Sequence, residues 1–178
     1  MVSTILNYKI MANKYSSISF REANKNDVKD IHELNEKIWR KIYHNLTTEE
    51  QMEYMLANVH SEKNIKELMD RNYHFFVGVK EEKIVAYSCT YTTDGKIYDL
   101  SRFYIDTDYH GNGIGEGFLN YLEEKNTPEI VYVDVNRKNF KAINFYFKSG
   151  FIIEKLEDKE FGEGFEMHTF MMVKKFVK

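Results

Sequence analysis

Apolar residues recur at helical spacing in the first part of the chain. Behind the pair Asn26-Asp27, which suits the start of a helix, they stand three or four positions apart: Val28, Ile31, Leu34, Ile38 and Ile42. A second helix is predicted from Thr47, which fits a capping box with Glu50, and a third over residues 65–69. The alternating run at residues 18–22 predicts a strand ahead of these helices.

Beyond residue 73 the pattern becomes that of strands. Runs rich in β-branched and aromatic residues predict strands over residues 74–79, 84–92, 97–105, 152–157 and 165–173. Residues 130–135 are densely β-branched with little alternation, which is typical of a strand buried on both faces. Helices are predicted over residues 115–124 and 140–148. The expected fold is mixed α/β, of the α+β type, with antiparallel hairpins flanking a central strand, helix and strand.

No linker or repeat divides the 178 residues, of which 43% are hydrophobic and 30% charged, as in a globular protein. We predict one domain over residues 16–178, behind a loosely ordered leader of residues 1–15. The leader lacks the continuous apolar core of a signal peptide, which predicts a cytoplasmic location. Nowhere do roughly 18 apolar residues run together, so no membrane partner is expected.

Charge and cysteine content exclude several classes of function. Because 25 Lys and Arg stand against 28 Asp and Glu, the net charge is -3, and no basic field favours a nucleic-acid partner. The single cysteine, Cys89, excludes an intramolecular disulfide and a cysteine-cluster metal site, and we expect it in the core. The histidines show no metal-ligand spacing, so no metal is proposed.

Glycine is scarce but clustered between a predicted strand and a predicted helix. Four of the nine glycines fall within seven positions: Gly111, Gly113, Gly115 and Gly117. Such a turn lets backbone amides converge on a phosphate, and a turn without a ligand is the plain alternative. The dinucleotide fingerprint fails because Glu116 or Phe118 stands where its third glycine belongs. A triphosphate loop fails because no lysine lies between Ile105 and Glu124.

The run His110-Gly111-Asn112-Gly113-Ile114-Gly115 resembles the acyl-CoA pyrophosphate loop of the GCN5-related N-acetyltransferase (GNAT) superfamily. That loop has Gln or Arg, two residues, Gly, one residue, and then Gly or Ala; here His110 replaces the Gln or Arg but leaves the backbone amides unchanged. The family's second signature is also present, as Asn139, Ala142, Phe145-Tyr146 and Gly150-Phe151. The two motifs cover about residues 98–152, and the order of elements extends the resemblance over most of the chain.

The resemblance implies the GNAT acyl-CoA N-acyltransferase fold: a central, mostly antiparallel sheet with a splayed parallel strand pair and helices on both faces. It implies acetyl-CoA as co-substrate, no metal, and direct attack of a primary amine in a ternary complex. Backbone amides around Tyr104 or Ile105 would hold the oxyanion. Of the basic residues near the second motif, Arg137, Lys138, Lys141 and Lys148, the last is best placed for the cofactor. The cofactor-binding residues implied are Phe103, Tyr104, Ile105, His110, Gly111, Asn112, Gly113, Ile114, Gly115, Asn139, Tyr146 and Lys148.

Two residues are predicted to be catalytic. A primary alkylammonium has a pKa of about 10.4, so a base must take its proton, and Asp99 occupies the strand register of the catalytic glutamate in the histone-acetylating branch. The alternative for Asp99 is a solvated acid or a direct substrate ligand. Tyr146 stands where many superfamily members place a tyrosine that hydrogen-bonds the CoA sulfur; the alternative is an aromatic side chain that only packs.

Acceptor specificity is the least constrained part of the prediction. Residues 45–70 hold six acids against two bases, a local charge of -4, which suits a cationic acceptor or an ordinary solvated helix face. The run from Trp39 to Ile65 also resembles the PaiA-like spermidine/spermine acetyltransferase branch. Three functions stay open: acetylation of a small amine such as a polyamine, acetylation of a protein N-terminus or lysine, and a non-catalytic CoA-binding regulatory module. A homodimer also stays open.

Overall fold

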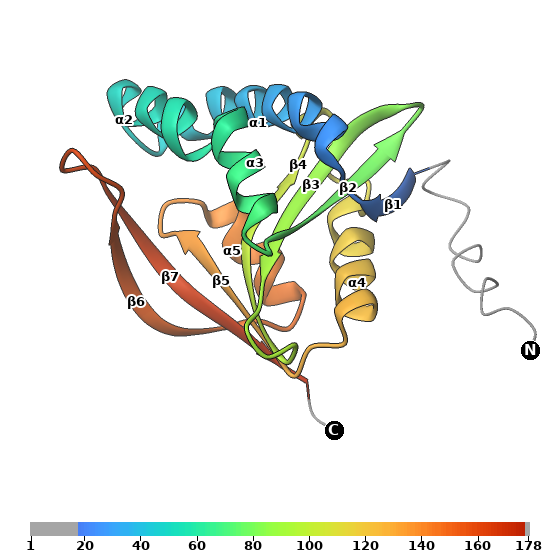
Figure 1. Ribbon diagram of the computed structural model, residues 1–178. Coiled ribbons are helices and arrows are strands. Elements are labelled where there is room, and N and C mark those ends of the chain that lie inside the picture. Colours follow the sequence, from blue (N-terminus) through green and yellow to red (C-terminus); the bar gives the residue numbers. More distant parts are fainter. Residues whose placement is uncertain (1–17, 177–178) are drawn as a thin grey trace, which may run out of the picture.

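The computed structural model describes residues 18–176, and the predicted leader lies outside them. A seven-stranded sheet forms the centre, in the order β1-β2-β3-β4-β5-β7-β6 (Figure 1). All neighbouring strands are antiparallel except the central pair, β4 and β5. The strands are β1 (Ile18–Glu22), β2 (His74–Lys80), β3 (Lys83–Tyr91), β4 (Ile97–Ile105), β5 (Ile130–Asn136), β6 (Ile152–Glu160) and β7 (Glu166–Lys175).

Helices cover both faces of the sheet (Figure 1). One face carries α1, α2 and α3, and the other carries α4 and α5. The helices are α1 (Val28–Ile42), α2 (Glu49–Tyr54), α3 (Glu62–Asp70), α4 (Ile114–Asn126) and α5 (Phe140–Lys148). Short helical turns adjoin them at Lys25–Asp27, Tyr43–Asn45, Met55–Val59 and Thr107–Tyr109. The predicted fold class is confirmed, with every predicted strand and helix present.

Helix α1 begins at Val28, directly behind the predicted Asn26-Asp27 pair, but Asp27 at its N-cap position makes no side-chain cap hydrogen bond within the helix. Asn24, not Asn26, forms a capping box with Asp27 and begins the turn that leads into α1. The α2 helix is capped by Thr48, whose hydroxyl accepts a hydrogen bond from the Gln51 backbone, so the prediction of Thr47 as the cap was wrong. Both residues of the Thr-Thr pair suit a cap, and the pattern of apolar residues does not separate them.

The central strands separate after a short parallel contact. Only Ile97–Asp99 of β4 pair with residues 130–132 of β5. Next along β4, Ser101 is an extra residue: Leu100 pairs with Thr90 of β3, and Arg102 pairs with Cys89. From residue 100 onward β4 has no ladder partner in β5, so the sheet opens at its centre. This opening is the splay that the family resemblance implies.

The prediction that β5 is buried on both faces was wrong. Val131, Val133 and Val135 are buried against the core beneath α4 and α5, while the intervening Tyr132 and Asp134 are only half-buried. Tyr132 and Asp134 alternate with the three valines in the sequence, and this alternation corresponds to the two faces of the strand.

Candidate active site

A cavity of about 920 Å³ runs through the opening between β4 and β5. On one face it reaches the C-terminal end of α1 at Lys41 and Tyr43. On the other it reaches the start of α4 at Gly115 and the α5 residue Tyr146. A ligand in this cavity would therefore pass from one side of the sheet to the other, with the unpaired edges of both strands beside it.

Most of the residues that the family motifs implied for the cofactor line this cavity. Asn112 does not; its side chain is exposed and lies near the Tyr109 carbonyl. Asp99 does not line it either. The residues brought together are Phe103, Tyr104, Ile105, His110, Gly111, Gly113, Ile114, Gly115, Asn139, Tyr146 and Lys148.

The glycine cluster forms the turn between β4 and α4. Gly111 and Gly113 have φ angles of +81° and +70°, a region that residues with a side chain rarely adopt. Gly113 begins α4 without a side-chain cap, so the first amides of the helix have no partner within it. Gly115 allows a close approach, because a Cβ there would lie 3.2 Å from the Phe145 ring. The turn thus presents free amides and a helix N-terminus to the cavity.

Replacing Gly113 with tryptophan is expected to raise the Kd for acetyl-CoA at least tenfold, equivalent to about 1.4 kcal/mol. The bulky residue strains the left-handed turn and disturbs the amides that follow it. Isothermal titration calorimetry measures the Kd, and Gly95→Trp is the matched control. Gly95 has the same φ of +70° but lies in the β3–β4 hairpin outside the cavity lining. Unchanged affinity in folded Gly113→Trp would contradict the loop assignment.

Tyr146 both packs against aromatic neighbours and lines the cavity, so its packing is compatible with the catalytic role, which stays a prediction. Its ring contacts Phe103, Phe145 and Phe151, and the residue is 4% exposed. Burial raises the pKa of the phenol well above its ordinary value, and Tyr104 adds to the shift. The hydroxyl therefore stays protonated at neutral and moderately alkaline pH, which suits a hydrogen-bond donor.

The structure adds an acid that the sequence interpretation missed. Asp134 projects from β5 into the cavity lining; its Oδ2 accepts a hydrogen bond from Lys159, while its buried Oδ1 has no partner among the described residues. Asp99 lies on the same face of the sheet, opposite Tyr132 in the last parallel pair. Although Asp99 keeps access to solvent, desolvation by the surrounding protein raises its pKa, and the charge of Asp134 raises it further.

Other polar residues from the sequence analysis have structural partners. The side-chain oxygen of Asn139 caps α5 by accepting from the Ala142 amide, which leaves its NH2 group as the donor for a cofactor. None of the acids of residues 45–70 lines the cavity. Several form ion pairs instead, as in Glu53 with Arg40, Glu62 with Lys66, Glu67 with Lys63, and Asp70 with Lys25.

The structure also bears on nucleophilic catalysis by cysteine, on metal binding and on membrane spanning. Cys89 is buried, and burial raises the pKa of its thiol to about 11, so it is a poor nucleophile. Within residues 18–176, no group of three His, Cys, Asp or Glu side chains is placed to hold a metal ion. Across that same part of the chain, each helix is too short or too polar to span a membrane.

The sequence profile of the Acetyltransferase (GNAT) family matches residues 29–151, more than half of the chain. The chain belongs to this family. An uncharacterized N-acetyltransferase of Mycobacterium tuberculosis is 27% identical over 124 residues, which cover 68% of this chain and 79% of that protein. The match to the profile includes the glycine turn and the helix of Tyr146.

Solved structures of GNAT proteins share the fold. The PaiA N-acetyltransferase of Thermoplasma acidophilum, in complex with coenzyme A, superposes with a TM-score of 0.76 at 22% identity, over 90% of this chain and 99% of that chain. The ribosomal-protein-S18-alanine N-acetyltransferase of Escherichia coli has a TM-score of 0.69 at 16% identity, over 89% and 94% of the two chains.

As a GNAT protein, the chain is an acetyl-CoA-dependent N-acetyltransferase, and the predictions of the superfamily, of the enzyme class and of acetyl-CoA are confirmed. The residues of this chain fit that co-substrate. Unpaired amides at the start of α4 suit its phosphates, and the unpaired edge of β4 suits its pantetheine chain.

Proposed function

We propose that this GNAT enzyme acetylates a small cationic amine, such as a polyamine, by direct attack in a ternary complex with acetyl-CoA. The observation that carries the proposal is Asp134, a residue of the cavity lining whose buried Oδ1 has no partner within residues 18–176. An ammonium group is a natural partner of such an oxygen, because a buried carboxylate oxygen that lacks a hydrogen bond is unfavourable even where the other oxygen is paired, as Oδ2 is with Lys159.

The aromatic side chains at the α1 end of the cavity support a cationic acceptor. Tyr43 and Tyr104 line the cavity on this side of the sheet, and ring faces attract cations. Asp99 adds a second carboxyl group on the same face. The acidic helices of residues 45–70 do not contribute to the lining, so the proposal depends on the sheet residues.

The reaction forms one C–N bond and breaks one C–S bond. Asp134 takes a proton from the ammonium group, directly or through water, and the free amine attacks the thioester carbonyl. Backbone amides of β4 near Tyr104 and Ile105, on the edge without a β5 partner, stabilise the oxyanion. Tyr146 donates a hydrogen bond to the sulfur as the C–S bond breaks, and the sulfur takes up the second proton that the nitrogen releases as the amide forms, so CoA leaves as the thiol. Asp99, the base that the sequence predicts, remains the competing candidate.

Release of the CoA thiol with a panel of acceptors tests the proposal. We expect turnover with spermidine, with other polyamines and with diamines. We expect little turnover with peptides or with amino acids whose side chains are uncharged. Turnover confined to peptides would instead support acetylation of a protein N-terminus or lysine. Tight CoA binding without turnover of any acceptor would support a regulatory module. The cytoplasmic location and the homodimer remain predictions, for which cell fractionation and light scattering are the measurements.

A further inference from the structure

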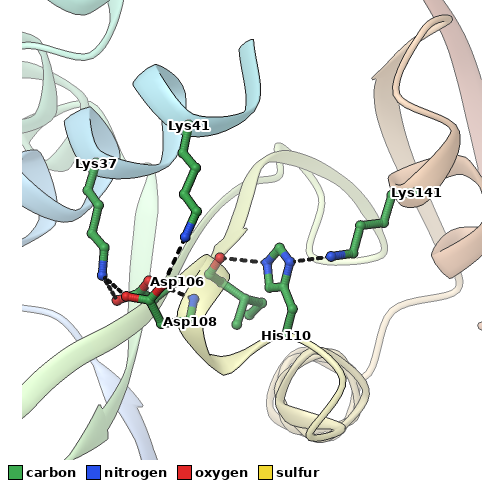
Figure 2. A network of polar contacts seen from close by, with 7 residues as sticks. Lys37, Lys41, Asp106, Asp108, His110 and Lys141 are labelled. Carbon is green, nitrogen blue, oxygen red and sulfur yellow. Dashed lines mark hydrogen bonds and ion pairs between the residues drawn. The ribbon is translucent and has the colours of Figure 1, made fainter. Parts of the chain in front are cut away.

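His110, the residue that replaces Gln or Arg in the glycine-loop motif, joins two elements at the edge of the cavity (Figure 2). Its Nε2 lies 2.9 Å from the backbone oxygen of Ile105, at the end of β4. Its Nδ1 lies 2.6 Å from Nζ of Lys141, in the first turn of α5. His110 and Lys141 both line the cavity, together with the glycines that follow His110.

The partners of the imidazole determine its protonation state. A backbone carbonyl only accepts, so Nε2 carries the proton, and Lys141 only donates, so Nδ1 accepts with its lone pair. His110 is therefore the neutral Nε2–H tautomer. Its surroundings agree: desolvation lowers its pKa, as do the charges of Lys141 on α5 and Lys41 on α1, while the Ile105 carbonyl and the Asp106 carboxylate oppose the shift.

The lysines around this loop differ in their partners. Lys37 and Lys41 of α1 both donate to Asp108, at 2.6 and 2.9 Å, and Lys37 also donates to Asp106 (Figure 2). Their charges are thereby balanced by carboxylates. Within residues 18–176 Lys141 is paired with the His110 imidazole instead, and no carboxylate there offsets its charge. Two of its three N–H groups remain for a ligand.

We propose that Lys141 binds a phosphate group of acetyl-CoA and that His110 is the residue that positions it. The imidazole fixes the ammonium beside the amides of the glycine turn, where the phosphates would lie. One side chain of the usual loop is thus replaced by a pair, in which His110 supplies the orientation and Lys141 supplies the charge.

The first test removes the charge at Lys141. We expect Lys141→Met to raise the Kd and KM for acetyl-CoA about tenfold, as for a charge-assisted hydrogen bond, with kcat unchanged. Lys138→Met is the matched control, because Lys138 is an exposed lysine nearby that does not line the cavity. Equal affinity in the two variants would overturn the proposal.

The same two variants titrated with 3′-dephospho-CoA identify the phosphate. If Lys141→Met weakens its binding as much as that of CoA, the contact is to the pyrophosphate. If the difference between the variants disappears, the contact is to the 3′-phosphate. Either result supports a phosphate contact, provided that CoA itself shows the loss.

The second test separates positioning from simple packing. A glutamine can donate to the Ile105 carbonyl and accept from Lys141, so His110→Gln is expected to keep the affinity for acetyl-CoA, whereas His110→Leu is expected to lose about as much as Lys141→Met. The double variant His110→Leu/Lys141→Met should then bind no more weakly than Lys141→Met alone. Additive losses in the double variant, or wild-type affinity in His110→Leu, would overturn the positioning role. Thermal unfolding of each variant identifies any that fails to fold.

Discussion

Replacing Tyr146 with phenylalanine is expected to lower kcat about a hundredfold while leaving the Kd for acetyl-CoA nearly unchanged. The ring packs against Phe103 and Phe151, so a phenylalanine keeps these contacts and removes only the hydroxyl of this cavity-lining residue. The lost hydrogen bond would act on the sulfur as the C–S bond breaks, and not on the bound ground state. Steady-state thiol release and calorimetry measure the two quantities.

The pH dependence of the wild-type enzyme gives a second check on Tyr146. Because burial raises the pKa of the phenol above its ordinary value, the neutral hydroxyl persists to higher pH than in a solvated tyrosine. Its ionisation should therefore cause no fall in kcat up to about pH 10, the ordinary pKa of tyrosine. Tyr121→Phe is the control variant for Tyr146→Phe, since the Tyr121 ring packs at a tilt against Phe20 and the residue lies outside the cavity lining. An undiminished kcat in Tyr146→Phe would exclude the proposed role.

The parts of the site that the sequence predicts are those encoded by short segments. The glycine turn requires residues that tolerate positive φ, as at Gly111 and Gly113, and few sequences place them so close to a helix start. Tyr146 lies seven residues after Asn139, which caps the same helix, so the position of one helix determines where both residues lie. Local geometry of this kind is visible in the order of residues alone.

The residues that the sequence does not identify depend on contacts between distant segments. Asp134 resembles any polar residue in a strand until β4 diverges from β5 and exposes it to the cavity. The proposed orientation of the Lys141 ammonium toward a phosphate depends on its contact with His110, which is 31 residues earlier in the chain. Conversely, acids such as Glu53 suggest an acceptor site in the sequence, but Glu53 is paired with Arg40 across two helices. The spacing of polar and apolar residues along the chain does not show which charged side chains form ion pairs.

Replacing Asp134 with asparagine is expected to lower kcat/KM for a cationic amine about a hundredfold, with the Kd for acetyl-CoA unchanged. Asparagine has nearly the same shape, but it neither attracts an ammonium group nor takes its proton. Because Lys159 donates to Asp134, the single variant leaves a partly buried cation without its carboxylate partner. The double variant Asp134→Asn/Lys159→Met restores the balance of charge, and it should keep the same catalytic defect if the role of Asp134 is chemical.

Asp99→Asn and Asp158→Asn complete this experiment. Asp158 lies on β6, pairs with Arg137 and His168 outside the cavity lining, and should change kcat/KM little. Asp99 lies on the same face of the sheet as Asp134 but outside the lining, so its charge should have an effect of several-fold at most. A large loss in Asp99→Asn with near-normal activity in Asp134→Asn would reverse the assignment. The base would then be the residue that the strand register predicts, acting through water, because the last parallel pair holds it at the closed end of the opening.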